Sequence, residues 1–210
     1  SRILGETVEV SGSGRTDAGA HARGQVVSFH CESTMPCDEI LSQLRRYLPE
    51  DIGIYSCREV SPRFHARLNA REKTYVYRIW NSDGPCVFQR RYVTVIPGAL
   101  DISAMRQAAS FLIGEHDFSA FCANRNVKKS TVRAIMDFEV FKVDDEIRFV
   151  VTGNGFLHHM VRIMVGTVLD IGLHRKKLDV IPEALATQNR HLVGRTAPAS
   201  GLYLKNVFYP

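Results

Sequence analysis

The stretch that decides the fold is VRAIMDFEVFKVDDEIRFVVTGNGFLHHMVRIMVGTVLDIGL, residues 132–173. Its first part predicts two strands that directly follow one another, over residues 132–142 and 146–152. Its second part predicts a long helix over residues 156–173, and at 100° per residue the apolar side chains cover most of the circumference of this helix. We therefore expect a helix that is largely buried.

Outward from this stretch, the remaining elements mix strands with helices. Strands are predicted over residues 6–11, 24–31, 52–60, 72–80 and 201–208, and helices over residues 36–48, 102–113 and 181–187. Because many strands are adjacent in sequence, we expect an α+β fold with a mixed, mainly antiparallel sheet of two similar lobes and helices packed on one face. Turn residues cluster at 81–85 and 97–99, which predicts an N-terminal lobe over residues 1–97 and a C-terminal lobe over residues 98–210.

The composition is that of a folded protein. The 210 residues are 45% hydrophobic, enough for one large domain or two half-size lobes. No apolar run approaches the ~20 residues of a membrane-spanning helix, and no basic-then-apolar signal segment begins the chain. We therefore expect a soluble cytoplasmic protein. The five cysteines are odd in number and form no C-x-x-C pair, which predicts reduced packing residues rather than disulfides or a zinc site.

The excess of positive charge is concentrated in one segment. The chain carries 27 Lys and Arg against 22 Asp and Glu, and residues 58–91 hold eight of the basic residues but only three of the acidic ones. Such a segment fits a polyanionic partner, although a solvated strand face explains it about equally well. Four interleaved aromatic residues favour nucleic acid, because bases stack on aromatic rings: Phe64, Tyr75, Tyr77 and Trp80.

A glycine-rich loop, GSGRTDAG at residues 12–19, precedes a predicted strand. It does not match a phosphate-binding loop, which would lead into a helix and end in Gly-Lys-Ser/Thr. The loop instead places Asp17 and Arg15 at its tip, between small residues that let a ligand approach closely. Spacing alone slightly favours a plain turn in which Asp17 accepts hydrogen bonds from nearby amides.

The long helix carries an arginine on its narrow polar strip. His158, Arg162 and Gly166 fall there at successive i, i+4 positions. A mostly buried arginine needs a carboxylate or phosphate partner, because an unpaired buried charge costs several kcal/mol. A purely structural ion pair would also meet this need. We expect His158 and His159 to be core histidines rather than metal ligands, because no third ligand is suggested nearby.

Six motifs connect these features from residue 14 to residue 204. They are Gly-Arg-Thr-Asp-Ala-Gly (14–19), Phe-His-Ala-Arg (64–67), Lys-Thr-Tyr-Val-Tyr (73–77), Gly-Glu-His-Asp-Phe-Ser-Ala-Phe (114–121), Phe-Leu-His-His-Met-Val-Arg-Ile-Met-Val-Gly (156–166) and Ala-Pro-Ala-Ser-Gly-Leu-Tyr-Leu (197–204). In type and order they resemble the motifs of the tRNA pseudouridine synthase A family. Members of that family begin with a further strand and helix before the first motif, and we expect these to be absent from this chain.

The resemblance implies that the protein isomerises uridine to pseudouridine at positions 38 to 40 of the tRNA anticodon stem-loop. It further implies a homodimer that binds tRNA in a central cleft and uses no cofactor and no metal. Asp17 would be the catalytic carboxylate, acting either as a nucleophile at C1′ or as a base at the 2′ position. Arg162 would pair with Asp17, and Tyr75 would stack on the target base. The matching motifs also imply further substrate-binding residues: Arg15, Arg23, His65, Arg67, Lys73 and Leu202.

Three alternative functions stay open on the sequence. A catalytically silent RNA-binding protein would share the basic segment but gives no reason for Arg162 to meet Asp17. A nucleotide-dependent phosphotransferase is disfavoured by the strand that follows the glycine-rich loop. A pseudouridine synthase with a different RNA target would carry the same residues.

Overall fold

The computed structural model describes residues 2–124, 126 and 128–210, and it has an α+β fold with a mainly antiparallel sheet. The chain divides into two compact units: unit 1 consists of Ser1–Gly14 and Val26–Asn69, and unit 2 of Arg15–Gln25 and Ala70–Pro210. The predicted lobe boundary at residue 97 falls inside unit 2, where strands from both sides of it belong to one sheet. The two similar lobes and the central cleft stay predictions.

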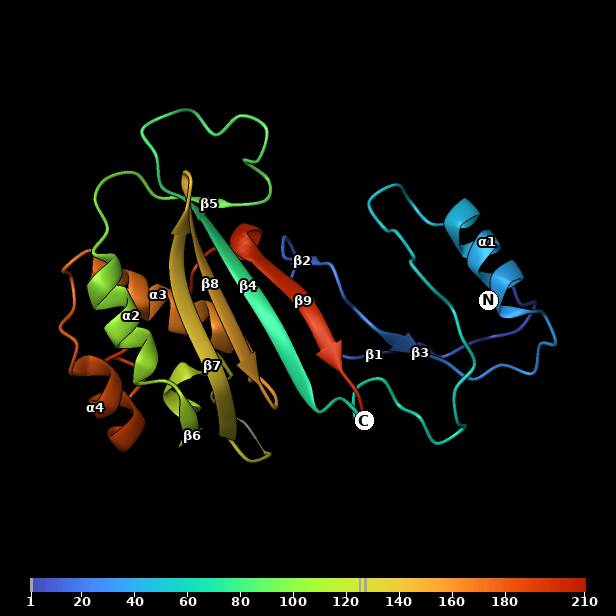
Figure 1. Cartoon of the computed structure of the whole chain (residues 1–210). Coiled ribbons are helices and arrows are strands. Elements are labelled where there is room, and N and C mark those ends of the chain that lie inside the picture. The colour runs from blue at the N-terminus through green and yellow to red at the C-terminus, as the bar shows by residue number, and fades with distance from the viewer. Residues whose placement is uncertain (1, 125, 127) are drawn as a thin grey trace. The chain divides into compact units, whose positions relative to one another are not determined.

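Unit 2 is built on a seven-stranded sheet (Figure 1). Its strands are β2 (His21–Ala22), β4 (Glu72–Trp80), β5 (Thr94–Val95), β6 (Gly114–Asp117), β7 (Val132–Val143), β8 (Glu146–Gly153) and β9 (Leu202–Phe208). The order is β2-β9-β4-β8-β7-β6, and β5 pairs with β4. Among the described strands only β2 and β5, both short, pair in parallel; the long strands are antiparallel, as predicted.

The two faces of this sheet have different roles. Alternate side chains of a strand point to opposite faces, and on one face Tyr77 and Phe149 are buried in a single hydrophobic core with residues of α2 (Ile102–Ser110) and α3 (Met160–Gly172). The helix α4 (Val180–Thr187) adds Ile181 to the same core. The opposite face carries Arg78 and Arg148, which lie directly across from one another on β4 and β8. The helices therefore cover one face of the sheet.

Helix α3 is buried along most of its length, as predicted, but it begins four residues later than expected. His159 has a φ of 59°, in the left-handed region, so the right-handed helix cannot extend to residues before it and begins at Met160. The predicted polar strip is therefore wrong for His158, which lies before the helix. Gly166 is buried in the helix, and a Cβ atom there would lie 1.8 Å from the backbone oxygen of Arg195, so that only glycine fits.

Unit 1 contains the helix α1 (Cys37–Tyr47) and two short antiparallel strands, β1 (Ser11–Gly12) and β3 (Val27–Ser28). The strands predicted over 6–11 and 24–31 are much shorter than expected. The strand predicted over 52–60 is wrong. The carbonyl oxygens of Ile54 and Tyr55 accept hydrogen bonds from the Arg45 side chain instead of from a neighbouring strand.

The five cysteines are free thiols, as predicted. Cys37 and Cys57, twenty residues apart in sequence, are nevertheless neighbours in unit 1. Burial and a hydrogen bond with Cys37 raise the pKa of the Cys57 thiol. Among the described residues, no helix is both long and apolar enough to cross a membrane.

Candidate active site

Asp17 lies in a tight loop of unit 2. The Ala20 amide donates a 2.9 Å hydrogen bond to the Asp17 carbonyl, and Gly19 has a φ of 81°, a conformation that a side chain would disfavour. The Asp17 carboxylate accepts no hydrogen bond from a loop amide in the described part of the chain. The plain-turn interpretation of the loop is therefore wrong, and the carboxylate has partners from elsewhere.

The first partner is Arg162, on the first turn of α3. Its Nη1 donates a 2.8 Å hydrogen bond to Asp17 Oδ2, and its Nε donates a 2.7 Å hydrogen bond to the Ala197 carbonyl. The Ala197 amide in turn donates to the Arg162 carbonyl over 3.0 Å. The arginine side chain is 14% exposed and that of Asp17 is 25% exposed. The mostly buried arginine therefore has the carboxylate that its environment requires, and two fixed contacts hold its planar group in place.

The second partner is His159, which the sequence did not single out for this role. Its Nε2 lies 3.3 Å from Asp17 Oδ2, the same oxygen that Arg162 contacts. The prediction of two core histidines is wrong: the His159 side chain is 26% exposed, and His158 is exposed and stacks on it with ring centroids 3.9 Å apart. His159 has a positive φ, and the spacing of residues in the sequence does not predict such a backbone conformation.

The protonation of His159 follows from its neighbours. Burial lowers the pKa of this imidazole, and the charges of His158 and Arg162 act in the same direction, whereas Asp17 opposes them. A neutral imidazole is therefore favoured at neutral pH, with Nε2–H available to donate to Asp17. Arg162 and His159 both contact the Oδ2 atom of Asp17. Within the described residues, Oδ1 has no hydrogen-bond partner.

Tyr75 completes the group. Its ring packs edge-on against Phe156 with the centroids 5.0 Å apart. Burial, with the charge of Asp17 as the second cause, raises the pKa of Tyr75 to about 12, so the phenol stays protonated at neutral pH. Tyr77, on the same face of β4, has a structural role: its hydroxyl donates to the Pro198 carbonyl over 2.8 Å and lies 2.6 Å from Thr94 Oγ1.

The other residues of unit 2 that the sequence singled out make no hydrogen bond or ion pair with Asp17 in the described part of the chain. Arg15 and Arg23 are exposed, and the Arg23 guanidinium lies 5.9 Å from the centre of the Tyr203 ring. Lys73 lies half-buried in β4, and Leu202 is buried at the start of β9. The structure therefore joins two of the predicted residues directly, Asp17 and Arg162, and the charge of Asp17 also acts on the pKa of Tyr75.

His65 and Arg67 belong to unit 1, where they share a turn. His65 Nδ1 accepts a 3.1 Å hydrogen bond from the Arg67 amide, and the His65 amide donates to Asn69 Oδ1 over 2.7 Å. The side chain of Arg67 is exposed. His65 therefore fixes the local backbone from which Arg67 extends.

Six of the eight basic residues in the segment at residues 58–91 are exposed, and Lys73 and Arg78 are not. Arg78 forms an ion pair with the buried Glu146, to which Arg148 Nε also donates over 3.0 Å. These two arginines hold the pKa of Glu146 below its usual value although burial alone would raise it. Arg78 therefore belongs to a structural ion-pair cluster. Six other arginines of the segment are exposed: Arg58, Arg63, Arg67, Arg71, Arg90 and Arg91.

Three potential metal ligands meet at this site. One ligand atom each from Asp17, His158 and His159 lies within 4.8 Å of the others, the one such group among the described residues. A cation would compete with the Arg162 guanidinium for Asp17 Oδ2. For this reason we assign the group no metal.

Comparison with known proteins identifies the family. Residues 108–210 match the family model described as tRNA pseudouridine synthase. The chain is 41% identical to tRNA pseudouridine synthase A 2 of a Bacillus cereus strain, over 99% of this chain and 84% of that protein. It is 43% identical to tRNA pseudouridine synthase A of Brevibacillus brevis, over 100% of this chain and 86% of that protein. It is also 42% identical to tRNA pseudouridine synthase A of Acetivibrio thermocellus, over 99% and 85%. The resemblance seen in the six motifs is thus confirmed, and the chain belongs to the tRNA pseudouridine synthase A family.

Proposed function

We propose that this protein converts uridine to pseudouridine at positions 38 to 40 of the tRNA anticodon stem-loop, with Asp17 as the catalytic carboxylate. Family membership supports isomerisation of uridine in tRNA, and the anticodon positions rest on the resemblance of the six motifs. The observation that carries the proposal is the Asp17–Arg162 ion pair. It holds a carboxylate, still one-quarter exposed, in a fixed orientation, and the charge of this carboxylate acts on the pKa of Tyr75, the ring on which we propose that the base stacks.

The reaction rearranges one nucleotide without adding or removing atoms. The bond between N1 and C1′ breaks, a bond between C5 and C1′ forms, C5 loses a proton and N1 gains one. Asp17 acts either as a nucleophile at C1′ or as a base at the 2′ position. Because Arg162 and His159 both contact Oδ2, we assign the reacting role to Oδ1.

The uridine has to leave the base stack before a carboxylate reaches C1′. Extrusion costs a few kcal/mol, which stacking in the site and contacts to phosphates offset. In the proposal, Tyr75 stacks on the uracil, and its protonated phenol is no base at neutral pH. Arg15, exposed two residues before Asp17, holds the RNA while the base is out. Further contacts to the RNA are assigned to Arg23, His65, Arg67, Lys73 and Leu202.

The proposal includes the setting of the reaction. The protein acts as a homodimer in the cytoplasm, with tRNA as its partner and without a cofactor. The exposed arginines of the segment at residues 58–91 fit the phosphates of a folded RNA.

The test compares tRNA transcripts that differ only at positions 38 to 40. A transcript with uridine at one of these positions should gain one pseudouridine, and a transcript with cytidine at all three should gain none. Conversion of uridines elsewhere in the second transcript would identify a different RNA target. Binding of both transcripts without any conversion, even with the protein in excess, would leave the RNA-binding alternative.

A further inference from the structure

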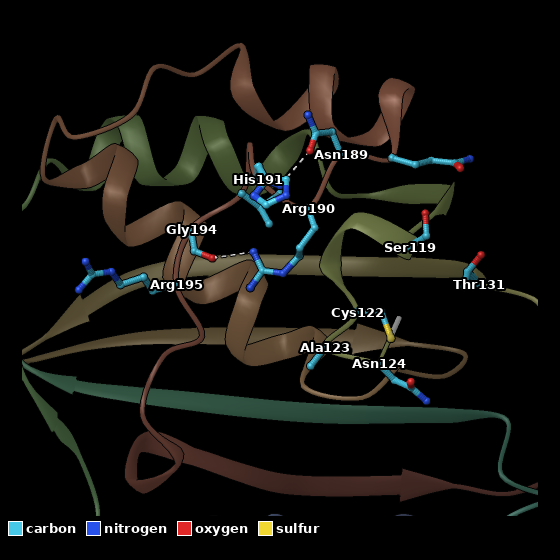
Figure 2. Close-up of a pocket in the computed structure, with 12 residues that line it drawn as sticks. Ser119, Cys122, Ala123, Asn124, Thr131, Asn189, Arg190, His191, Gly194 and Arg195 are labelled. Carbon is cyan, nitrogen blue, oxygen red and sulfur yellow. Dashed lines mark hydrogen bonds between the residues drawn. The ribbon is translucent and has the colours of Figure 1, made fainter. Parts of the chain in front are cut away.

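An open pocket lies in unit 2, and its lining includes Ala123, whose amide donates a hydrogen bond to the His158 carbonyl. It has a volume of about 890 Å³, within the range of sites that bind small molecules. Two segments form its walls (Figure 2): residues 119–124 with Thr131, and residues 188–195 between α4 and β9. All of these residues belong to unit 2.

The lining of this pocket is basic and rich in hydrogen-bonding groups. Among the described residues its lining contains two arginines and no carboxylate, together with the side chains of Ser119, Asn124, Thr131, Gln188, Asn189 and His191. The nearby Asp117 carboxylate is already occupied by the Ser119 amide and the Gln188 side chain. Arg190 lies between the two walls and donates a 3.1 Å hydrogen bond to the Gly194 carbonyl, and Arg195 lies at the edge of the pocket and is exposed (Figure 2). A site of this kind favours an anion that also accepts and donates hydrogen bonds. The sugar–phosphate backbone of RNA meets both requirements.

Both walls of the pocket are joined to the residues around Asp17. The Ala123 amide donates a 3.0 Å hydrogen bond to the His158 carbonyl, next to His159. On the other wall, Arg195 is followed two residues later by Ala197, which exchanges hydrogen bonds with Arg162. A nucleotide held in the pocket would therefore be a near neighbour of the group that contacts Asp17.

We propose that this pocket binds the sugar–phosphate backbone of the tRNA strand next to the uridine at Asp17, with Arg195 and Asn124 contacting phosphate or ribose oxygens. The inference rests on the proposed function, because it takes the RNA as the substrate. It adds a binding site on residues 119–124, Thr131 and residues 188–195, which is separate from the basic segment at residues 58–91. A strand held at this site and at Tyr75 would be fixed on two sides of the reacting nucleotide.

The test measures the affinity of fluorescent tRNA for the full chain over a range of salt concentrations. Arg195→Gln removes one exposed charge and should weaken binding at low salt and reduce the slope of log affinity against log salt by about 0.7 to 0.9. Asn124→Asp has nearly the same size, and a carboxylate can still accept the hydrogen bond that Asn124 Oδ1 accepts from the Asn126 amide. The added negative charge should weaken binding several-fold.

Arg175→Gln is the matched control, because this arginine is exposed on the same unit but outside the pocket. It should leave affinity and slope close to those of the parent. The proposal is overturned if both pocket variants bind tRNA like the parent, or if Arg175→Gln has as large an effect as Arg195→Gln. Pocket binding of inorganic phosphate, without any effect of Asn124→Asp on tRNA affinity, would also overturn it. Pseudouridine formation by the parent protein is measured in parallel, so that a failure of the proposed function is recognised separately.

Discussion

Arg162 donates a 2.8 Å hydrogen bond to Asp17 across 145 residues of sequence. This contact ties the loop at residues 15–20 to the first turn of α3, and the same guanidinium is held by the Ala197 carbonyl. Because both ends of the contact lie in unit 2, its geometry depends on one compact part of the chain. The orientation of the carboxylate is therefore a property of that unit.

Replacing Arg162 should affect catalysis more than binding. Arg162→Met removes the positive charge that contacts Asp17 Oδ2, and turnover should fall by roughly 10²-fold or more, as for other preorganised donors. Affinity for tRNA should change only a few-fold. Arg162→Lys should restore little, because an ammonium cannot contact Asp17 and Ala197 with one planar group. Single-turnover assays and binding assays measure the two effects.

The control for this arginine is Arg106→Met. Arg106 also donates from Nε to a backbone carbonyl, that of Val140 over 2.8 Å, but it contacts no carboxylate among the described residues. Its replacement should leave turnover near that of the parent. Parent-like turnover in Arg162→Met would mean that the ion pair is only structural.

His159 should make stability depend on pH. Its pKa is lowered in the folded protein, so the unfolded chain binds the proton more readily. The free energy of unfolding should therefore decrease as the pH falls through the ordinary histidine value of about 6.5. His159→Gln should lose this component and show a smaller decrease between about pH 7.5 and 5.5 than the parent, measured by urea unfolding.

His174→Gln serves as the control, because the side chain of His174 is 75% exposed. It should follow the pH dependence of the parent. If parent and His159→Gln lost the same stability over this range, the assigned environment of His159 would be wrong.

Tyr75 should act through its ring rather than its hydroxyl. In the described residues the hydroxyl has no hydrogen-bond partner, so Tyr75→Phe should retain stability and most of the turnover, whereas Tyr75→Leu should lose turnover with the aromatic face. With a pKa of about 12, Tyr75 should produce no inflection in the pH–rate profile below about pH 11. Equal turnover in the Phe and Leu variants would contradict the stacking role.

The neighbouring tyrosine supplies the comparison. Tyr77→Phe removes a buried hydroxyl that donates to the Pro198 carbonyl and lies 2.6 Å from the buried Thr94 Oγ1, which should cost about 1–3 kcal/mol of unfolding free energy. Its effect should appear in thermal or urea unfolding.

Exposed and paired arginines of the basic segment should behave differently. Changing Arg63, Arg67 and Arg71 to Glu should weaken tRNA binding broadly and reduce its salt dependence, because these side chains are exposed. Arg78→Gln should instead lower stability, by roughly 3 kcal/mol, because it leaves the buried Glu146 with only Arg148 as a partner. An unchanged affinity and salt slope in the triple variant would show a merely solvated surface.

Long periodic segments were predictable from the sequence. The strands β4, β7, β8 and β9 and the buried helix α3 have enough residues for their alternation or helical period to stand out. Strands β5 and β6 were missed because they are two and four residues long, and the sequence of β6, GEHD, is polar. The segment 52–60 has an apolar pattern typical of a strand, but two of its carbonyl oxygens accept hydrogen bonds from the Arg45 side chain instead of from a neighbouring strand.

The candidate site was predictable in part for similar reasons. The need of Arg162 for a carboxylate follows from burial, and the motifs implied that Asp17 supplies it. The contact of His159 with Asp17 depends on a single positive φ and on folding that brings residues 17 and 159 together. The structural use of Arg78 depends on the register between β4 and β8 and could not be read from charge alone.

The most direct test of the account is single-turnover pseudouridine formation by Asp17→Asn, with the protein in excess over a tRNA transcript. Asparagine keeps the size of the side chain and can accept a hydrogen bond from Arg162, but it has neither the charge nor the basicity of the carboxylate. Asp144→Asn, at an exposed turn residue, is the control and should match the parent. We predict that Asp17→Asn folds and binds tRNA with an affinity near that of the parent while pseudouridine stays at background. A folded Asp17→Asn variant that forms pseudouridine at a rate comparable to the parent would contradict the central assignment.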